Sequence, residues 1–384
     1  MASHPTFPDD IMVEILLKLP VKSILRCNTL SKHYYSLIHS QYFIRRHLNL
    51  GRLNANLYDQ AIASPVVGSV RLFDRIGHFK SLDDLSPIVQ FFTMFFKRLI
   101  CGPVNGLYCV IEAVFSFTVV LNPATKEQSL FRRALLKRNN TKGNQIVTKT
   151  YEEAIRRCYA CGFGYDDTTD DYKVVLIYGY ASDTAEDCSI MVKSKFYILN
   201  VSTREWRNSE QCFGIKAWNI KSNVGIFVHG ACHWVYTTPS HDSAYSILAF
   251  DMLTESYRII TFPTVRDEYD WSEECIIVAF NGFLGLVNAH RVHYRKALSS
   301  SFDVWAMIEY GVTESWTILH RVSLKPGIVG RFSGIVGNRF YVRQSDGWLV
   351  SYDLDSKDEE RHGISDINVE NLLPYEESLV RIVK

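Results

Sequence analysis

One strand-and-turn pattern recurs through most of this 384-residue chain. Each copy has an alternating apolar strand, an Asn or Asp, a turn with Thr or Ser beside a charged residue, and then the start of another strand. The five copies lie at 119–127, 196–206, 248–257, 305–316 and 350–357. Asx and Thr side chains stabilise tight turns, and alternating apolar residues favour half-buried strands. Each copy therefore predicts a β-hairpin.

The spacing of the copies predicts how the hairpins assemble. Their turn residues Thr203, Thr254, Thr313 and Ser356 follow one another at intervals of roughly 40 to 60 residues, which is typical of the four-stranded blades of a β-propeller. A β-sandwich of stacked hairpins is the alternative. Because an open apolar edge promotes association, the last apolar run, 378–383, is expected to close the ring beside a strand at 66–73.

The first fifty residues carry a helical pattern instead. Pro8 and Pro20 bracket a short predicted helix, since proline suits a first helical turn and cannot continue a helix. Apolar residues with helical spacing suggest one apolar face made of Ile11, Ile15, Leu16 and Leu19. Further short helices are expected after Pro20 and after Ser31, which is a good N-cap residue. So small a unit cannot bury all its apolar surface alone, so it should meet a partner protein or the rest of the chain.

This N-terminal pattern resembles the F-box, the motif with which many proteins dock on the Skp-type adaptor of cullin-based ubiquitin ligases. The similarity runs through positions 8, 10–11, 14–16, 19–23, 25–26, 31–32 and 36–38. It implies an F-box over residues 1–48 and a role as the substrate-recognition subunit of a Skp–cullin–F-box ubiquitin ligase. The adaptor-binding residues that it implies are Pro8, Ile11, Ile15, Leu16, Leu19, Pro20, Val21, Leu25, Leu30, Ser31, Leu37 and Ile38.

The β-rich part, residues 49–384, resembles the kelch-like F-box-associated domains of plant F-box proteins. The strings 121–125, 162–166, 171–175 and 201–206 carry this similarity. The fold class expected is therefore a multidomain α+β chain, with a small helical F-box before an all-β, propeller-like substrate-binding domain. Within the plant group, the chain is most similar to the pollen S-locus F-box proteins, through 304–312, 314–316, 349–354 and 375–380.

The S-locus similarity implies a particular target, the pistil S-ribonuclease, which such a receptor would direct to proteasomal degradation in self-incompatibility. An F-box receptor for another plant regulatory protein is the alternative. Because S-ribonucleases are typically basic, an acidic loop would suit them. The candidate substrate-binding residues are Asp267, Glu268, Asp270, Glu273 and Glu274.

Charge and cysteine content bear on the binding of nucleic acid or membranes and on the cellular compartment. Lys and Arg number 42 against 41 Asp and Glu, so the chain lacks the basic balance that favours nucleic acid or an anionic membrane. Nine cysteines without a framework spacing, and no signal-like N-terminus, favour a reducing compartment. We expect the cytoplasm, with the nucleus as an alternative because the stretch 132–149 is basic.

Three local motifs invite a metal-site interpretation that their context disfavours. Cys158 and Cys161 have a ligand-like spacing but no second pair follows, so reduced core thiols are expected. His229 and His233 lie in a strand context and are expected at the core or rim. The acidic run 166–171 lacks the Gly and distal Glu of a calcium loop and predicts a hairpin turn. We expect no cofactor, metal or catalytic activity, with a propeller enzyme as the weaker alternative.

Overall fold

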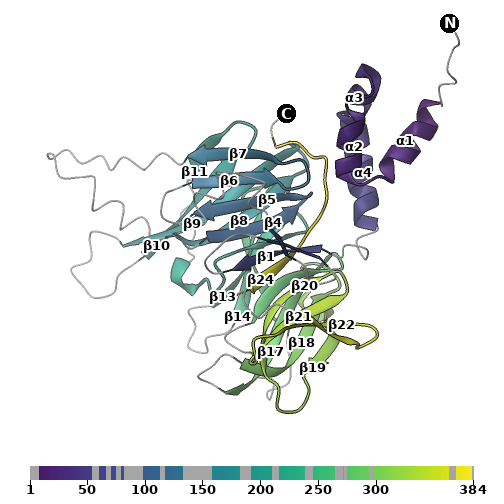
Figure 1. The fold of residues 1–384 in the computed structure, drawn as a ribbon. Helices are drawn as coiled ribbons and strands as arrows, with labels where there is room; N and C mark the ends of the chain where they lie inside the picture. Colours follow the sequence, from purple (N-terminus) through teal and green to yellow (C-terminus); the bar gives the residue numbers. More distant parts are fainter. Residues whose placement is uncertain are drawn as a thin grey trace, which may run out of the picture.

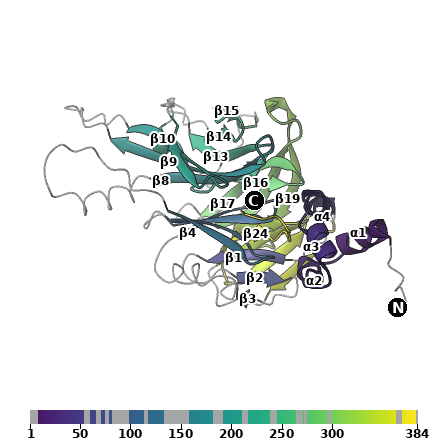
Figure 2. The same ribbon diagram turned by 90° about the horizontal axis from the view of Figure 1, so that it is seen from above.

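The computed structural model describes residues 8–53, 60–65, 71–74, 79–81, 98–112, 117–132, 158–181, 192–209, 216–237, 245–263, 271, 275–293, 298–362 and 369–382. Within these ranges, four α-helices come first and strands follow (Figure 1). Seen from above, the helices lie to one side of the β structure (Figure 2). The expected fold class, a small helical unit before an all-β propeller-like domain, is confirmed.

The N-terminal unit is built from α1 (Asp9–Leu17), α2 (Val21–Cys27), α3 (Lys32–Ile38) and α4 (Gln41–Leu53). Pro20 separates the first two helices because it has no N–H with which to continue α1. The Ser31 hydroxyl accepts a hydrogen bond from the backbone N–H of Tyr34 at 3.2 Å, so Ser31 caps α3 as expected. Helix α4 continues past residue 48, the boundary expected from the sequence.

In the described residues, antiparallel strands form five sheets. The first has the order β24 (Val369–Pro374), β1 (Gln60–Pro65), β2 (Arg71–Asp74) and β3 (Phe79–Ser81). The second runs β4 (Arg98–Val104), β5 (Leu107–Glu112), β6 (Phe117–Asn122) and β7 (Glu127–Arg132). The third runs β8 (Cys158–Asp166), β9 (Asp171–Ala181), β10 (Val192–Asn200) and β11 (Glu205–Asn208).

The fourth sheet runs β12 (Ile226–Val228), β13 (Ala231–Thr237), β14 (Tyr245–Asp251) and β15 (Tyr257–Thr261). The fifth joins two consecutive meanders through the single pair Ser299–Gly330. Its first meander is β16 (Ile276–Phe280), β17 (Phe283–His293), β18 (Leu298–Met307) and β19 (Trp316–Ser323). Its second is β20 (Gly330–Val336), β21 (Arg339–Gln344), β22 (Leu349–Asp353) and β23 (Glu359–His362).

The tight turns repeat one hydrogen-bonding arrangement. Side-chain oxygens of Asn122, Asp166, Asp251 and Asp353 each accept hydrogen bonds from the backbone N–H groups two and three residues later. The last residue of these four turns has a positive φ, at Lys126 (64°), Asp170 (51°), Glu255 (54°) and Lys357 (66°), and so does Arg204 (61°) in the turn after Asn200. The hairpins expected from the repeat are thus confirmed, and so is the turn expected at 166–171.

The fourth sequence copy departs from this arrangement. Between β18 and β19 the chain turns at Gly311, whose φ is 89°, and then forms the short 3₁₀ helix η4 (Thr313–Ser315). A longer connection replaces the Asx turn here because Glu309 occupies the position that holds Asn or Asp in the other copies.

The C-terminal strand closes the first sheet, but not with the residues expected. Strand β24 pairs with β1 from Ala61–Pro374 to Pro65–Val369, so a strand from the end of the chain joins strands from the start of the domain. The sequence predicted instead that the run 378–383 would lie beside 66–73; residues 66–70 and 383 lie outside the described residues, and residues 71–73 pair with β1 and β3. That run has the apolar content of a strand, but Ser378–Ile382 is an irregular segment packed against other parts of the molecule.

The hydrophobic core lies between neighbouring sheets. Trp234 on β13 is fully buried, and its indole N–H donates to the carbonyl of Cys161 on β8 at 3.0 Å. A Cβ atom at Gly162 or Gly225 would lie 2.8 Å or less from the indole ring. Glycine at these two positions therefore lets the third and fourth sheets approach each other closely.

Candidate docking site on the N-terminal helices

Helix α1 has two apolar faces rather than the single face expected from the sequence. Val13, Leu16 and Leu17 point into the helical core and are less than 10% exposed. Ile11 and Ile15, in contrast, are 48% and 46% exposed. The periodic pattern grouped Ile11 and Ile15 with Leu16, which was wrong, because a helix this apolar presents a second stripe beside the one that packs.

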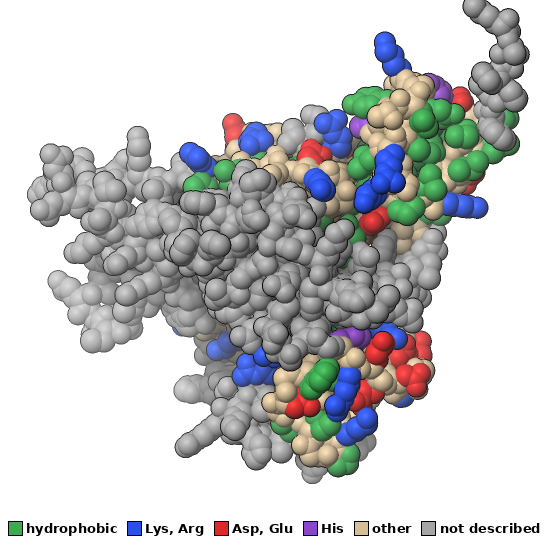
Figure 3. Space-filling view, in the orientation of Figure 1, with side chains coloured by type: hydrophobic (Ala, Val, Ile, Leu, Met, Phe, Trp, Pro, Cys, Tyr) green, Lys and Arg blue, Asp and Glu red, His purple; other side chains and the backbone are tan. Residues whose placement is uncertain are grey.

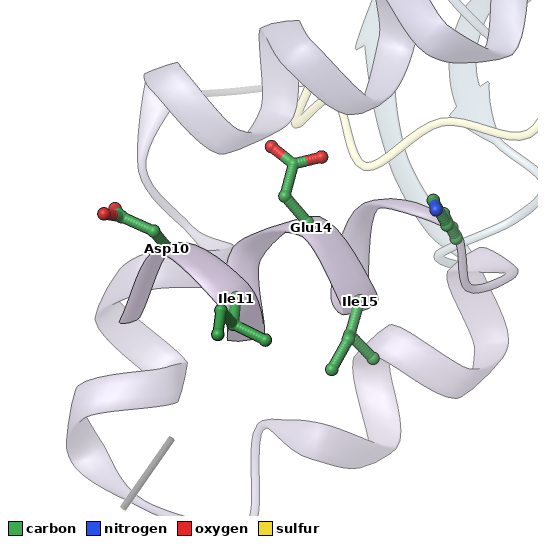
Figure 4. Close-up of a pocket in the computed structure, with 5 residues that line it drawn as sticks. Asp10, Ile11, Glu14 and Ile15 are labelled. Carbon is green, nitrogen blue, oxygen red and sulfur yellow. The ribbon is translucent and has the colours of Figure 1, made fainter. Parts of the chain in front are cut away.

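The second stripe lines an open groove on the surface of α1. Five residues line it: Asp10, Ile11, Glu14, Ile15 and Lys18. Figure 4 shows the two isoleucine side chains projecting in the same direction, with the carboxylates of Asp10 and Glu14 on the other side of the helix. An apolar strip bordered by charged side chains matches the usual anatomy of a protein–protein interface, with an apolar centre and a polar rim.

Helix α4 holds one acidic residue at the rim of this groove, Glu14, in place. The guanidinium group of Arg46 donates to Glu14 Oε1 at 2.7 Å and to the Tyr42 hydroxyl at 3.0 Å. These hydrogen bonds to Glu14 and Tyr42 raise the pKa of Arg46. Because Arg46 is always charged, Glu14 is oriented across the α1–α4 contact rather than left to rotate freely.

The twelve residues expected to bind an adaptor differ in exposure. Exposed are Pro8, Ile11, Ile15, Pro20, Leu30 and Ser31, while Leu19, Leu25 and Leu37 are partly exposed. Leu16, Val21 and Ile38 are buried in the helical core. The three buried residues cannot touch a partner in this conformation; they shape the unit from inside because their side chains fill the space between the helices.

Two exposed aromatic residues were missed by the sequence analysis. Tyr35 is 50% exposed and stacks on His39, with ring centroids 4.1 Å apart. Tyr42 is 62% exposed and lies under the Arg46 guanidinium group. Hydrophobic side chains gather over the visible face of the helices in Figure 3. The sequence could have indicated this surface through Tyr42, which lies among charged residues in the helical stretch 41–47.

The candidate residues on the propeller have mostly structural surroundings. Cys161 is buried, with its Sγ 3.5 Å from Cys101 Sγ, as expected for a core thiol. His233 is buried and its Nε2 lies 2.7 Å from the Tyr310 hydroxyl, whereas His229 is exposed and stacks on the same tyrosine. Both histidines thus lie at the core or rim, as predicted. The side chain of Cys158 lies outside the described residues.

Other expectations fall on parts of the chain that the structure leaves undescribed. The acidic candidates Asp267, Glu268, Asp270, Glu273 and Glu274 lie outside the described residues, as do residues 133–149 of the basic stretch. Among the described side chains, no group of three His, Cys, Asp or Glu residues is placed to hold a metal ion. No helix within the described ranges is long and apolar enough to cross a membrane.

The helical unit and the sheets together define a two-part protein with an exposed apolar stripe on its first part. Residues 5–46 match the F-box domain, and residues 78–327 match the F-box associated beta propeller domain. The chain therefore belongs to the family of F-box proteins with an F-box-associated β-propeller.

Similar proteins from Arabidopsis thaliana cover most of the chain. F-box protein CPR1 is 25% identical over 371 residues, which cover 92% of this chain and 83% of that protein. An F-box/kelch-repeat protein is 26% identical over 329 residues, covering 83% and 80% respectively. A solved structure of a nidogen/laminin complex gives a TM-score of 0.44 at 9% identity, covering 83% of this chain and 99% of that one, which is too distant to support an argument.

Proposed function

We propose that this chain is a non-catalytic substrate receptor of a Skp–cullin–F-box ubiquitin ligase. The helical unit binds the Skp-type adaptor, and through it a cullin, while the propeller binds a target protein. The observation that carries the proposal is the exposure of Ile11 and Ile15 on the F-box helix α1, within a unit whose other large apolar residues are mostly buried or partly buried. Holding target and ubiquitin-charged enzyme in one assembly accelerates transfer by proximity.

The size of the apolar surface suits docking rather than a solvent-facing helix. Fully burying an isoleucine side chain contributes about 1.5–3 kcal/mol, so two that are already half-buried contribute roughly half that amount each. Leu30, which is 66% exposed, and the two tyrosines would add to this area. The charged rim of Asp10, Glu14 and Lys18 would then contribute to the choice of partner.

A matched pair of double variants tests the proposal. Ile11→Glu/Ile15→Glu places two charges on the α1 stripe, and Ile259→Glu/Ile276→Glu makes the same change at propeller residues that are 42% and 39% exposed. We expect the first variant to lose capture by a purified Skp-type adaptor at least tenfold, and the second to bind normally. Circular dichroism checks that both remain folded. Normal adaptor binding by the α1 variant would refute the proposal.

For the target, we propose a basic S-ribonuclease of the pistil, with the receptor acting in the cytoplasm of the pollen tube. The similarity of positions 304–312 and 349–354 to the pollen S-locus F-box proteins supports this choice. Co-purification from native tissue, with the whole chain and with a chain lacking residues 1–48, identifies the partners of each part. An S-ribonuclease retained by the shortened chain would support the proposed target. A different regulatory protein retained in its place would refute that target and identify another.

A further inference from the structure

The last described residues of the chain run between the helical unit and the propeller. After β24, residues 375–382, here called the C-terminal strap, continue without regular secondary structure. Figure 1 shows this yellow segment passing along the β4–β7 sheet on the side that faces the helices. Four of its residues are less than 10% exposed: Tyr375, Ser378, Leu379 and Ile382. An irregular segment with this burial is held by specific contacts, which can be traced on both sides.

On the propeller side, the strap is fixed by hydrogen bonds at regular intervals. The Asn122 side-chain amide donates to the carbonyls of Ser378 and Val380 at 2.9 and 2.8 Å. The backbone N–H of Gly106 donates to Glu376 Oε2 at 3.1 Å. The Ile382 N–H donates to the Glu127 carboxylate at 3.3 Å. Three positions of the second sheet, Gly106, Asn122 and Glu127, thus form hydrogen bonds with the strap.

Close packing confirms that this contact has little room to shift. Gly106 has a φ of 78°, and a Cβ atom there would lie 2.2 Å from Ser378 Cβ and 2.9 Å from the Glu376 carbonyl oxygen. The strap backbone therefore rests directly on the β4–β5 turn. Any side chain at Gly106 would displace it, because backbone atoms cannot move aside as a flexible side chain can.

On the helical side, the strap supplies an N-cap that the sequence of the helix lacks. Helix α2 begins directly after Pro20, whose side chain makes no capping hydrogen bond. Instead, Glu377 Oε2 accepts a hydrogen bond from the backbone N–H of Val21 at 3.0 Å, across 356 residues of sequence. A carboxylate at this position satisfies a free N–H group and interacts favourably with the helix dipole.

The apolar residues of the strap divide between the two cores. Leu379 packs into the helical core with residues such as Leu16 and Ile24, whereas Ile382 packs into the core between the second and third sheets. Val380 packs against both. Neighbouring positions on one short segment therefore take part in the hydrophobic core of each domain.

Among the described residues, a direct ion pair between the domains is weaker than these contacts. Arg45 on α4 lies 3.4 Å from Asp170 in the β8–β9 turn, but its side chain is 61% exposed, and exposed pairs of this kind contribute about 0–1 kcal/mol. We infer that the C-terminal strap is the element that fixes the F-box relative to the propeller. Ile11 and Ile15 stay exposed with the strap in place, so this coupling leaves the α1 groove free.

The consequence for function rests on the proposed receptor role. If α1 binds the adaptor and the propeller binds the target, the strap sets the orientation in which the target meets the ubiquitin-charged enzyme. A fixed orientation favours transfer, because a group held in reach of a reactive centre avoids the entropic cost of a search. The strap would then be a positioning element that contacts neither partner.

A release variant of the full-length chain tests this inference. Glu377→Ala/Leu379→Ser removes the α2 cap and the apolar contact, and Glu314→Ala/Leu253→Ser makes the same chemical changes at exposed propeller positions. In the release variant we expect amide hydrogen exchange over residues 19–27 to accelerate on the order of fivefold. We also expect small-angle scattering of the free chain to show a larger maximum dimension, and the control variant to match the wild type in both measurements.

Each outcome decides the inference. Wild-type exchange and scattering in the release variant would overturn it. If that variant loses helical signal, the single change Glu377→Ala, which leaves both cores filled, decides through the exchange at residues 19–27. Adaptor capture is measured in parallel and is expected to persist. If the wild-type chain itself fails to bind the adaptor, the proposed function fails, while exchange and scattering still report on the strap.

Discussion

The ammonium group of Lys173 lies 2.8 Å from a carboxylate oxygen of Asp166, with the two side chains 5% and 1% exposed. Lys173 also donates to the carbonyl of Met252 at 2.6 Å and lies 3.1 Å from Glu255, so it joins the third sheet to a turn of the fourth. Burial opposes the charge on Asp166, but hydrogen bonds from Lys173 and Thr169 outweigh it and hold the pKa of Asp166 below its usual value.

Replacing Lys173 by methionine should strongly destabilise the propeller. The methionine keeps most of the volume but leaves the Asp166 carboxylate buried without its cation, and breaking a buried pair in this way costs about 3–5 kcal/mol. Urea unfolding followed by tryptophan fluorescence measures the change in the free energy of unfolding. Lys221→Met, at an exposed position, is the control and should be close to neutral. A similar small change at both positions would contradict the structural role given to Lys173.

His233 should make the propeller sensitive to acid. The pKa of this histidine is lowered from an ordinary value of 6.5 to about 4, chiefly by burial and also by the nearby charges of Arg258 and His229, while the hydrogen bond with the Ile226 carbonyl acts in the opposite direction. The unfolded chain therefore takes up this proton at a higher pH than the folded chain does. The stability that His233 contributes is fully present above pH 6.5 and is lost as the pH falls from 6.5 to about 4.

This acid-dependent loss of stability can be measured by comparing the wild-type chain with a His233→Gln variant. A shift of this size corresponds to about 3 kcal/mol between the two ends of that range. His233→Gln keeps a polar side chain beside Tyr310 but does not titrate, so its unfolding free energy should fall less between pH 7 and pH 4.5 than that of the wild type. His47 and His362, whose pKa values burial also lowers, titrate in both chains and cancel in the comparison. Parallel pH profiles would disprove the assignment.

Ile15 and Leu16 are sequence neighbours with opposite roles. Leu16→Ala should destabilise the helical unit by about 2–5 kcal/mol, because it leaves a cavity where a side chain with 2% exposure now packs. Ile15→Ala should change stability by about 0.5 kcal/mol or less, yet weaken adaptor binding roughly fivefold as a contact residue. Thermal unfolding and adaptor titration on the same pair separate the two effects. Equal stability losses would show that α1 has one packed face after all.

The same pair shows where sequence reasoning succeeds and where it stops. Local features were predicted well: Pro20 separates α1 from α2, Ser31 caps α3, and Asx residues form the tight turns. These depend on atoms a few residues apart. The pattern could not decide whether Ile15 or Leu16 meets the core, because both are apolar and one helical step apart.

Contacts between distant parts of the chain were the other feature that the sequence could not predict. The sequence predicted that the C-terminus would close the propeller, but selected 378–383 rather than β24. Both runs are apolar, and only the three-dimensional positions of Asn122 and Val21 explain why the later one becomes the strap. The capping of α2 by Glu377 has no local signal at all, since its two partners lie at opposite ends of the chain.

The closure of the ring can be tested at a glycine that faces β24. Gly334 on β20 has a φ of 158°, and a Cβ atom there would lie 2.3 Å from the carbonyl oxygen of Leu372 on β24. Gly327→Ala is the matched control, because Gly327 has a φ of 80° but nothing within 4 Å of its Cβ position. The control should lose about 1–2 kcal/mol of stability through backbone strain alone. Gly334→Ala should lose about 1–3 kcal/mol more, because the new methyl group forces β24 away from β20.

Urea unfolding of both variants gives the difference, and hydrogen exchange of β1 should rise only in Gly334→Ala, since β1 is paired with β24. If the two variants unfold alike, the contact between β20 and β24 does not hold the ring closed.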